Sequence, residues 1–383
     1  LWGSIGESGN IRINLPPDTE SIYTNPSYFQ GVVGCTDENA CNYNSDATVD
    51  DDTCEFSGNI WYVSEIGGGD GCPGSVDSPF VSIQFAIDNA SDGDTVFVAS
   101  GTYYENINFN GKNISVIGED REATIIDGGD NDCVVKIMNN ETELTLLSNF
   151  TIQNGFFDNS QGGNLGGGIS IINSNPTLQN LIIINNFSME AGGGIYFENS
   201  SSSLTNLIIT NNEASSGGGI KLYSYSNVNV SNVELAYNDA IGNGDTGGGL
   251  QITVDSYIYG SDLTADNNYA EYGGGISCTF QSSLNIDSLI VQNNESSMHG
   301  GGIYVYTSNL DIDNSIISNN SAGITTDVGT SGRGGGIWTH ESNVDIDNSI
   351  ISDNLSGSIT NPSDGGGVYL KNSSIFNINN SSI

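Results

Sequence analysis

The sequence has few basic residues. It contains 7 Lys and Arg against 46 Asp and Glu among 383 residues, which gives a formal net charge of −39 at pH 7. Nucleic acids and anionic membranes are bound through basic patches, so neither is predicted as a partner. This acidity favours cations, a salty exterior or basic partners instead. The sequence also lacks any run of 18 apolar residues, so no transmembrane helix is predicted.

The sequence does not begin with Met, and nothing near Leu1 resembles a signal segment. We therefore expect a mature product or a fragment. The sequence ends partway through a repeat, at Ile383, and we expect further chain beyond it.

Glycine is abundant, with 51 residues, and much of it recurs as triplets. The triplets begin at Gly166, Gly192, Gly217, Gly247, Gly273, Gly300, Gly334 and Gly365. Between them an Asn recurs, in most repeats as the second member of an Asn pair, at Asn186, Asn212, Asn238, Asn268, Asn294, Asn320 and Asn354. A period of this length indicates a solenoid or a propeller.

Each repeat contains short alternating apolar runs typical of strands, such as Ile195–Glu198, and leaves no room for a helix. Most repeats are also shorter than a propeller blade. The predicted fold is therefore all-β, a parallel β-helix solenoid in which each repeat forms one coil. Equivalent residues then stack about 4.8 Å apart, so the Asn column is expected to form an amide ladder. The glycines are expected to supply positive φ and close contact at one corner.

The pattern GGGI followed by IxxNN, over residues 150–383, resembles the GGAI and FxxN repeats of polymorphic outer-membrane adhesins. The resemblance implies a right-handed, pectate-lyase-like β-helix. Residues 60–118 also resemble the N-terminal segment of many secreted β-helix proteins. Within this segment, Ile83, Ala86, Ile87 and Ala90 predict a short amphipathic helix with Ser82 as its N-cap. We expect this helix to cover the first coil.

The segment GCTDENACNYNSDATVDDDTCEF resembles a Cys-rich module of secreted bacterial proteins, with DDDTC in place of DDGSC. Cys35, Cys41, Cys54 and Cys72 suggest a disulfide framework of undetermined connectivity and an oxidising location. Cys133 and Cys278 are expected to be buried free thiols. The predicted domains are a linker or tail at 1–33, an acidic Cys-rich module at 34–57, and a β-helix at 58–383. The β-helix divides into a cap at 58–93 and coils at 94–383.

The same module is a candidate calcium site, because Ca²⁺ favours several oxygen ligands. Its candidate ligands are Asp37, Asp50 and Asp52. Their spacing does not fit the EF-hand loop, and a solvated acidic loop is the alternative.

The strand after each glycine triplet changes character along the repeats. In the last three coils its outward positions carry aromatic residues, namely Tyr304, Tyr306, Trp338, His340 and Tyr369. Such a surface can bind a glycan or a protein partner. The alternative is that these residues only stabilise the strands.

A second face is acidic. LNIDSL, LDIDNS and VDIDNS occur in the same register in three coils and place Asp287, Asp311, Asp313, Asp345 and Asp347 outward. Like charges facing each other destabilise a sheet, so a Ca²⁺ ladder or high salt is one explanation. A solubilising face is the other.

Carboxylate pairs also raise the possibility of a polysaccharide-active enzyme. Adjacent coils supply such pairs everywhere, and no lyase or hydrolase motif is present. Alternation places His340 and Glu341 on opposite sides of the strand. Extra residues enter the repeats at one corner, at 240–246, 321–333 and 355–364, and lead into the aromatic strands. This arrangement favours a binding rim along one edge.

The sequence therefore predicts a secreted or cell-surface protein, non-enzymatic, that acts in adhesion or carbohydrate binding. Its predicted partner is an extracellular glycan or a surface protein, with Ca²⁺ as the only cofactor considered. A polysaccharide-active lyase or glycosidase is the first alternative. A structural stalk of a larger surface protein is the second.

Overall fold

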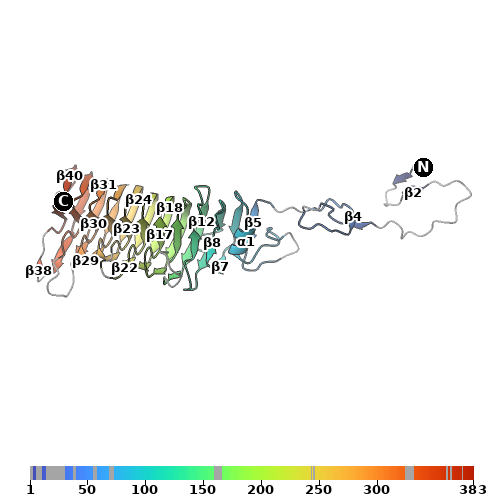
Figure 1. Cartoon of the computed structure of the whole chain (residues 1–383), viewed down its shortest axis with the longest axis horizontal. Helices are drawn as coiled ribbons and strands as arrows, with labels where there is room; N and C mark the ends of the chain where they lie inside the picture. Colours follow the sequence, from blue (N-terminus) through green and yellow to red (C-terminus); the bar gives the residue numbers. More distant parts are fainter. Residues whose placement is uncertain are drawn as a thin grey trace, which may run out of the picture. The chain divides into compact units, whose positions relative to one another are not determined.

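The structure is a computed structural model, shown in Figure 1. It describes residues 3–5, 11–13, 31–37, 40–54, 58–68, 73–158, 166–242, 244, 246–323, 332–358, 361–362, 365–372 and 374–383. The chain divides into two compact units, Leu1–Phe56 and Ser57–Ile383.

The N-terminal unit contains two small strand pairs. Strand β1 (Gly3–Ile5) is antiparallel to β2 (Ile11–Ile13), and β3 (Val32–Val33) is parallel to β4 (Ala47–Val49). A disulfide joins Cys35 to Cys54, as expected of a Cys-rich module. The fourth cysteine of the predicted framework, Cys72, lies outside the described residues.

The second unit is a stack of parallel coils, and the chain passes through three sheets in each coil (Figure 1). The ten-stranded sheet follows the glycine triplets. Its strands are β8 (Ile107–Asn108), β11 (Val135–Ile137), β14 (Ile169–Ile172), β17 (Ile195–Glu198), β20 (Ile220–Tyr223), β23 (Leu250–Thr253), β26 (Ile276–Thr279), β30 (Ile303–Tyr306), β34 (Ile337–His340) and β39 (Val368–Lys371).

The seventeen-stranded sheet comes next along each coil and contains the longest strands. Its strands are β5 (Ile60–Val63), β6 (Thr95–Val98), β7 (Gly101–Tyr104), β9 (Ser115–Gly118), β10 (Thr124–Asp127), β12 (Leu146–Gln153), β15 (Thr177–Ile184), β18 (Ser201–Thr210), β21 (Asn227–Ala236), β24 (Tyr257–Asp266), β27 (Ser283–Asp287), β28 (Ile290–Gln292), β31 (Asn309–Asp313), β32 (Ile316–Ser318), β35 (Asn343–Asp347), β36 (Ile350–Ser352) and β40 (Ile375–Asn379). Strand β5, within the segment predicted as the cap, pairs in parallel with β6.

The nine-stranded sheet closes each coil. Its strands are β13 (Phe156–Phe157), β16 (Phe187–Ser188), β19 (Glu213–Ala214), β22 (Asp239–Ala240), β25 (Tyr269–Tyr272), β29 (Glu295–His299), β33 (Ser321–Ala322), β37 (Leu355–Ser358) and β38 (Asn361–Pro362), with β38 antiparallel to β37.

Equivalent side chains stack in register inside the coils. In the ten-stranded sheet one inward column consists of Ile195, Ile220, Leu250, Ile276, Ile303 and Ile337, all fully buried. The period-2 alternation of the sequence therefore fills a continuous apolar interior, which supplies the main driving force for folding. Cys278 belongs to this interior, and Cys133 lies just before β11. Both are buried free thiols, as predicted.

Two steric reasons explain why the corner consists of glycine. Gly217, the first residue of its triplet, has φ +62°, which glycine adopts without strain. A Cβ on the next residue, Gly218, would overlap the carbonyl oxygen of Asp239 in the neighbouring coil. The predicted roles of the corner, positive φ and close approach of the coils, are both confirmed.

The second Asn of each pair forms the predicted amide ladder. Each side-chain Nδ2 donates to Oδ1 of the next Asn, at 2.9–3.1 Å, along Asn186, Asn212, Asn238, Asn268, Asn294, Asn320 and Asn354. The first Asn of the pair has a different function. Asn211, for example, has φ +54°, a conformation that Asn tolerates better than most residues.

A single short helix, α1 (Ile83–Asn89), covers the first coil in the described part of the chain. Ser82 is its N-cap and accepts a hydrogen bond from the Phe85 N–H, as predicted. Glu105 accepts hydrogen bonds from the N–H groups of Ile83 and Gln84 at the N-terminus of α1. At the other end, Lys112 Nζ donates to carbonyl groups of the last turn. Both charges have the sign that stabilises the helix ends.

Candidate functional site

The candidate site lies on the outward face of the ten-stranded sheet. The predicted aromatic residues come from three successive strands of this sheet, β30, β34 and β39. Their register pairs Tyr304 with Trp338, Trp338 with Tyr369, and Tyr306 with His340. The alignment of these five side chains across successive coils is therefore as the sequence predicted.

Four of these rings are nearly parallel. Tyr304 stacks on Trp338 with ring centroids 4.5 Å apart and an interplanar angle of 5°. Tyr306 stacks on His340 at 4.9 Å and 4°. Parallel rings at these distances attract each other by about 0.5–1.5 kcal/mol per pair beyond the area they bury. The stack therefore has a stabilising role of its own, whatever else it does.

We expected all five rings to be exposed on this surface, but Trp338 and His340 are buried. They are only 3% and 9% exposed. The centroid of the Trp338 ring lies 4.5 Å from that of Tyr304 and 5.4 Å from that of His299. His299 comes from the neighbouring nine-stranded sheet. Strand alternation shows that a side chain points away from the interior, but it does not show what covers that side chain. The accessible part of the aromatic surface is formed by Tyr304, Tyr306 and Tyr369, which are half-buried.

Turn geometry also changes the position of Glu341. Alternation placed it on the opposite side of the strand from His340, but Glu341 has φ +48° and its carboxylate lies 3.7 Å from His340 Nε2.

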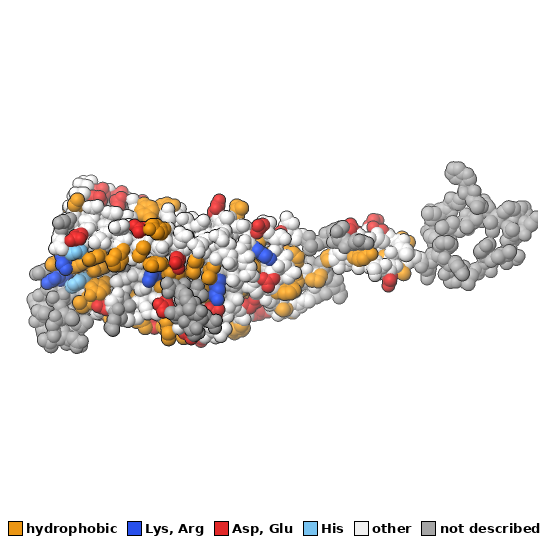
Figure 2. All heavy atoms as spheres, viewed as in Figure 1, with side chains coloured by type: hydrophobic (Ala, Val, Ile, Leu, Met, Phe, Trp, Pro, Cys, Tyr) orange, Lys and Arg blue, Asp and Glu red, His pale blue; other side chains and the backbone are white. Residues whose placement is uncertain are grey.

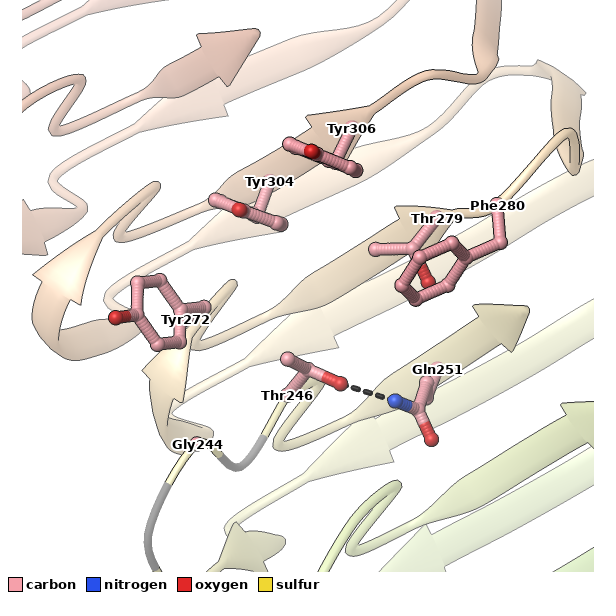
Figure 3. A pocket seen from close by; sticks show the side chains of 8 residues that line it. All are labelled: Gly244, Thr246, Gln251, Tyr272, Thr279, Phe280, Tyr304 and Tyr306. Carbon is pink, nitrogen blue, oxygen red and sulfur yellow. Dashed lines mark hydrogen bonds between the residues drawn. The ribbon is translucent and has the colours of Figure 1, made fainter. Parts of the chain in front are cut away.

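A groove of about 370 Å³ lies beside the half-buried Tyr304 and Tyr306. We call it the aromatic groove, and it is lined by Gly244, Thr246, Gln251, Tyr272, Thr279, Phe280, Tyr304 and Tyr306. Figure 3 shows these side chains around a common hollow, with Tyr304 and Tyr306 on one side and Thr246 and Gln251 on the other. The Gln251 amide donates to the Thr246 hydroxyl, which connects the corner insertion to the sheet.

The insertion at 240–246 therefore borders the aromatic strands, as its position in the repeat predicted, through Gly244 and Thr246. The insertion at 321–333 lies outside the described residues between 324 and 331. The one at 355–364 is described only in part.

Two aromatic residues of the groove were missed by sequence reasoning. Tyr272 ends β25 directly before a glycine triplet, and its ring lies 5.3 Å from that of Tyr304. Phe280 lies in the turn after β26, with φ +54°, and is 57% exposed. Both residues flank the outward columns of the ten-stranded sheet from which the aromatic surface was predicted. An aromatic residue at the corner or the turn that flanks an aromatic strand is the signal that could have found them.

The hydroxyls of Tyr304 and Tyr272 remain neutral donors over a wide pH range, because the pKa of each is raised. Burial raises the pKa of Tyr304, and the nearby Tyr272 and Tyr306 raise it further. Burial also raises the pKa of Tyr272, with a smaller contribution from Glu271. The groove thus offers aromatic faces, phenol hydroxyls and the Gln251 amide, but no Asp or Glu among its described lining residues.

The acidic face lies on the seventeen-stranded sheet. Its register aligns Asp287, Asp313 and Asp347 in one column and Asp311 and Asp345 in another. This confirms the predicted stacking. Burial raises the pKa of Asp311, and the neighbouring carboxylates of Asp345, Asp347 and Asp313 raise it further.

Asparagine amides donate hydrogen bonds to these carboxylates, which sequence reasoning did not foresee. Asn285 Nδ2 donates to Asp311 at 3.0 Å, and Asn348 Nδ2 donates to Asp313 at 2.8 Å. Such bonds to a charged acceptor offset part of the repulsion that the stacking causes. They give the acidic columns a source of stability that requires no metal ion.

The calcium predictions remain predictions. Within the described ranges, no group of three or more His, Cys, Asp or Glu side chains is arranged to hold a metal ion. In the Cys-rich module, Asp37 is exposed, and Asp50 Oδ1 accepts a hydrogen bond from the Asp52 N–H. These carboxylates therefore also fit the solvated loop that was the alternative.

A family model described as the right-handed β-helix region matches residues 193–333. The comparison with curated proteins finds no match. No helix in the described part of the chain is long and apolar enough to cross a membrane.

Several solved structures resemble the chain at low identity. Pectin methylesterase from carrot is 13% identical, with a TM-score of 0.40 over 81% of this chain and 87% of that chain. Pectate lyase Pel9A is 14% identical, with a TM-score of 0.44 over 84% and 78%. Tailspike protein 2 of bacteriophage CBA120 is 12% identical, with a TM-score of 0.48 over 77% of this chain and 44% of that chain.

Such likenesses carry no argument about activity, and the resemblances to adhesin repeats and to the Cys-rich module remain predictions. The strand pairing and the matching family model together establish the fold: the chain is a right-handed parallel β-helix, as the sequence predicted.

Proposed function

We propose that this protein binds a saccharide in the aromatic groove and does so without catalysing a reaction. The observation that carries the proposal is the groove itself. It combines the half-buried Tyr304 and Tyr306 with Tyr272 and Phe280 around a hollow of about 370 Å³. Small-ligand sites have this character, with aromatic walls and a few polar groups that fix orientation.

The chemistry of the groove suits a sugar. The apolar C–H face of a pyranose can pack on an aromatic ring, while its hydroxyl groups bond to polar side chains at the rim. Here the Tyr304 and Tyr306 rings are parallel within 2°, with centroids 6.5 Å apart. Gln251 and Thr279 lie close by with an amide and a hydroxyl group. The aromatic surface is thus wide enough for more than one sugar unit.

A polysaccharide-active enzyme is the less favoured alternative. Glycosidases use two carboxyl groups about 5–9.5 Å apart on either side of the scissile bond. The described lining of the groove contains no carboxylate. The acidic face supplies many, but its columns lie on a different sheet from the aromatic rings.

The proposed setting is extracellular, on a bacterial surface or secreted from it, where the protein serves adhesion. The Cys35–Cys54 disulfide supports this setting, because disulfides persist in oxidising compartments. A protein partner or a purely structural stalk would share the setting but would make no use of the groove.

The test is binding to an array of defined oligosaccharides, followed by calorimetry on the best ligand with the Tyr304→Ala variant. We expect its affinity to fall about two- to tenfold, since a stacked ring contributes about 0.5–1.5 kcal/mol. Tyr104→Ala is the matched control, because Tyr104 is 77% exposed and lies in β7, in another sheet. Circular dichroism of both variants checks the fold.

Binding that Tyr304→Ala leaves unchanged would place the site elsewhere. Release of reducing or unsaturated sugars from the best ligand would favour the enzyme. Binding to no oligosaccharide at all, together with capture of a surface protein, would replace the glycan by a protein.

A further inference from the structure

Basic side chains gather on the face that carries the aromatic groove, although the chain has only 7 of them against 46 acidic ones. Lys136 and Lys221 occupy the same outward column of the ten-stranded sheet as Tyr304. Lys371 pairs in register with His340, and Arg333 forms a β-bridge with His299. Four of the seven basic residues of the chain thus lie on or beside this face. Figure 2 shows Lys, Arg and His side chains beside a band of hydrophobic ones at the C-terminal coils.

At the C-terminal end of the groove these residues form a cluster around Trp338. The Lys371 ammonium lies 5.7 Å from the centroid of the Trp338 ring, and the His299 ring stacks on the same indole at 5.4 Å. The Arg333 guanidinium lies 5.2 Å from the centroid of the Tyr369 ring. We call His299, Arg333, Trp338, His340 and Lys371 the cationic cluster. It adjoins the groove directly, because Trp338 stacks on Tyr304.

Several polar atoms of the cluster are buried without a partner. Among the described residues, Trp338 Nε1, Arg333 Nε, His299 Nδ1 and His340 Nδ1 have no hydrogen-bond partner. Trp338 and His340 are themselves more than nine-tenths buried. A buried donor without an acceptor costs about 1–3 kcal/mol, so such groups are rare in folded proteins unless something else satisfies them. Indole and guanidinium N–H groups can only donate, so the missing component is an acceptor.

The charges of the cluster are also largely uncompensated. Neither Arg333 nor Lys371 has a carboxylate of a described residue within ion-pair distance. Glu341 lies beside the cluster, with its carboxylate 3.7 Å from His340 Nε2. Burial lowers the pKa of His299, and the positive charges of Arg333 and Lys371 lower it further. If these cations only balanced the charge of the chain, they would be expected to pair with its abundant carboxylates.

We propose that the cationic cluster binds an anionic group, a carboxylate or a sulfate, on the saccharide that occupies the aromatic groove. The ligand is therefore an acidic oligosaccharide. Its sugar units pack against Tyr304 and Tyr306, and its anionic group accepts hydrogen bonds from Trp338 Nε1 and Arg333. Lys371 contributes its charge from the exposed side. This inference rests on the proposed function, because it names the class of saccharide that the groove selects.

The test compares matched ligands by calorimetry on the full chain. One pair is a uronic acid oligosaccharide and its methyl ester, and the other is a sulfated oligosaccharide and its desulfated form. We expect the anionic member of one pair to bind at least about tenfold more tightly than its neutral form, because hydrogen bonds to charged acceptors are the stronger ones. The pair that shows this difference identifies the anionic group. The difference should also shrink in high salt.

Three variants connect this preference to the cluster. Arg333→Gln combined with Lys371→Gln should lower affinity for the anionic ligand about tenfold and leave affinity for its neutral form within about twofold. Trp338→Phe keeps an aromatic ring against Tyr304 but removes the indole N–H together with the pyrrole ring, so it should weaken the anionic ligand more than its neutral form. Arg121→Gln is the control for net charge, because Arg121 lies between β9 and β10, away from the cluster.

The outcomes separate the two proposals. Equal binding of anionic and neutral forms, or an equal loss of both in the double variant, overturns the anion site and leaves saccharide binding intact. Failure of every oligosaccharide to bind overturns the proposed function and the anion site together. An anion preference that Arg121→Gln weakens as much as the double variant does would reflect net charge, and would also overturn the site.

Discussion

Removing one rung of the asparagine ladder tests how the coils are held together. Asn268 is 1% exposed, and its side chain makes four hydrogen bonds. Its Oδ1 accepts from the backbone N–H and from Nδ2 of Asn238, at 2.9 and 3.1 Å. Its Nδ2 donates to the Leu235 carbonyl and to Asn294 Oδ1, at 2.9 and 3.0 Å. Asn268→Ala removes all four bonds.

The cost follows from what remains unpaired. The backbone N–H of Asn238 is left buried with no other described acceptor, which costs about 1–3 kcal/mol. The other three bonds each contribute about 0.5–1.5 kcal/mol, and Asn238 Nδ2 and Asn294 Oδ1 keep one further partner each. We expect Asn268→Ala to lower the free energy of unfolding by about 3–5 kcal/mol. That is a large share of the roughly 5–15 kcal/mol typical of folded domains.

Urea unfolding followed by circular dichroism measures the loss. Asn229→Ala is the matched control, because Asn229 is exposed on β21 and its side chain bonds to no described residue. Its effect should stay within about 0.5 kcal/mol. A second variant, Asn268→Asp, keeps an acceptor oxygen but turns the donor toward Asn294 Oδ1 into a second acceptor. It should therefore be at least as unstable as Asn268→Ala. If Asn268→Ala and Asn229→Ala unfold at the same urea concentration, the ladder does not stabilise the coils.

Three further predictions concern the cap and the acidic face. Lys112→Met should lower the free energy of unfolding by about 1–3 kcal/mol in thermal melts, because Lys112 Nζ donates to the carbonyls of Ile87, Asp88 and Ala90 at 2.7–2.8 Å. The pKa of Asp311 is raised, so the folded state binds the Asp311 proton more tightly than the unfolded state does. As the pH rises through and above the ordinary Asp pKa of 3.8, ionised Asp311 therefore lowers the free energy of unfolding. Asp311→Asn should therefore stabilise the protein at pH 7 relative to pH 3.5, as measured by the difference in melting temperature from the unmodified chain. If the acidic columns bind Ca²⁺, millimolar Ca²⁺ should raise the melting temperature, and Asp313→Asn should remove the effect.

Each of these has a clear contrary result. Lys136→Met removes a surface ion pair with Asp132 and should cost only about 0–1 kcal/mol, so an equal loss in Lys112→Met would contradict the capping role. An Asp311→Asn variant with the same pH profile as the unmodified chain would show that neither burial nor the neighbouring carboxylates raise the pKa of Asp311. A melting temperature that neither Ca²⁺ nor a chelator changes would end the calcium prediction.

The fold could be predicted from the sequence because equivalent positions of successive repeats lie next to each other in the stacked coils. Once the period was known, the buried Ile column, the Asn268 ladder and the Gly217 corner followed from simple geometry. The helix at Ile83 was equally local, since its apolar spacing and Ser82 lie within nine residues. Glu105 and Lys112 were not predicted as caps, because their contacts with the helix join positions about 20 residues apart outside the repeat.

The candidate site could be predicted only in part. The positions of Tyr304 and Tyr306 follow from alternation, but the groove also needs Tyr272 and Phe280, which lie in a corner and a turn. Trp338 is buried partly by His299, which comes from another sheet, and the periodic pattern of a single strand cannot predict that contact. The Asn amides that donate to the acidic columns come from positions one coil away in the same sheet. Strand period thus predicts columns, whereas packing between sheets decides which of them remain accessible.

The asparagine ladder also gives the stack of coils a net dipole along its axis. In every rung from Asn186 to Asn354 the amide nitrogen faces the C-terminal coil and the oxygen faces the N-terminal one. The amide dipoles therefore add instead of cancelling, as peptide dipoles do along an α-helix, and the ladder carries a fraction of a positive elementary charge at its C-terminal end. That end belongs to the coils that hold Arg333 and Lys371. A structural column hidden inside the protein thus makes the potential of these coils more positive, in a chain that is acidic overall.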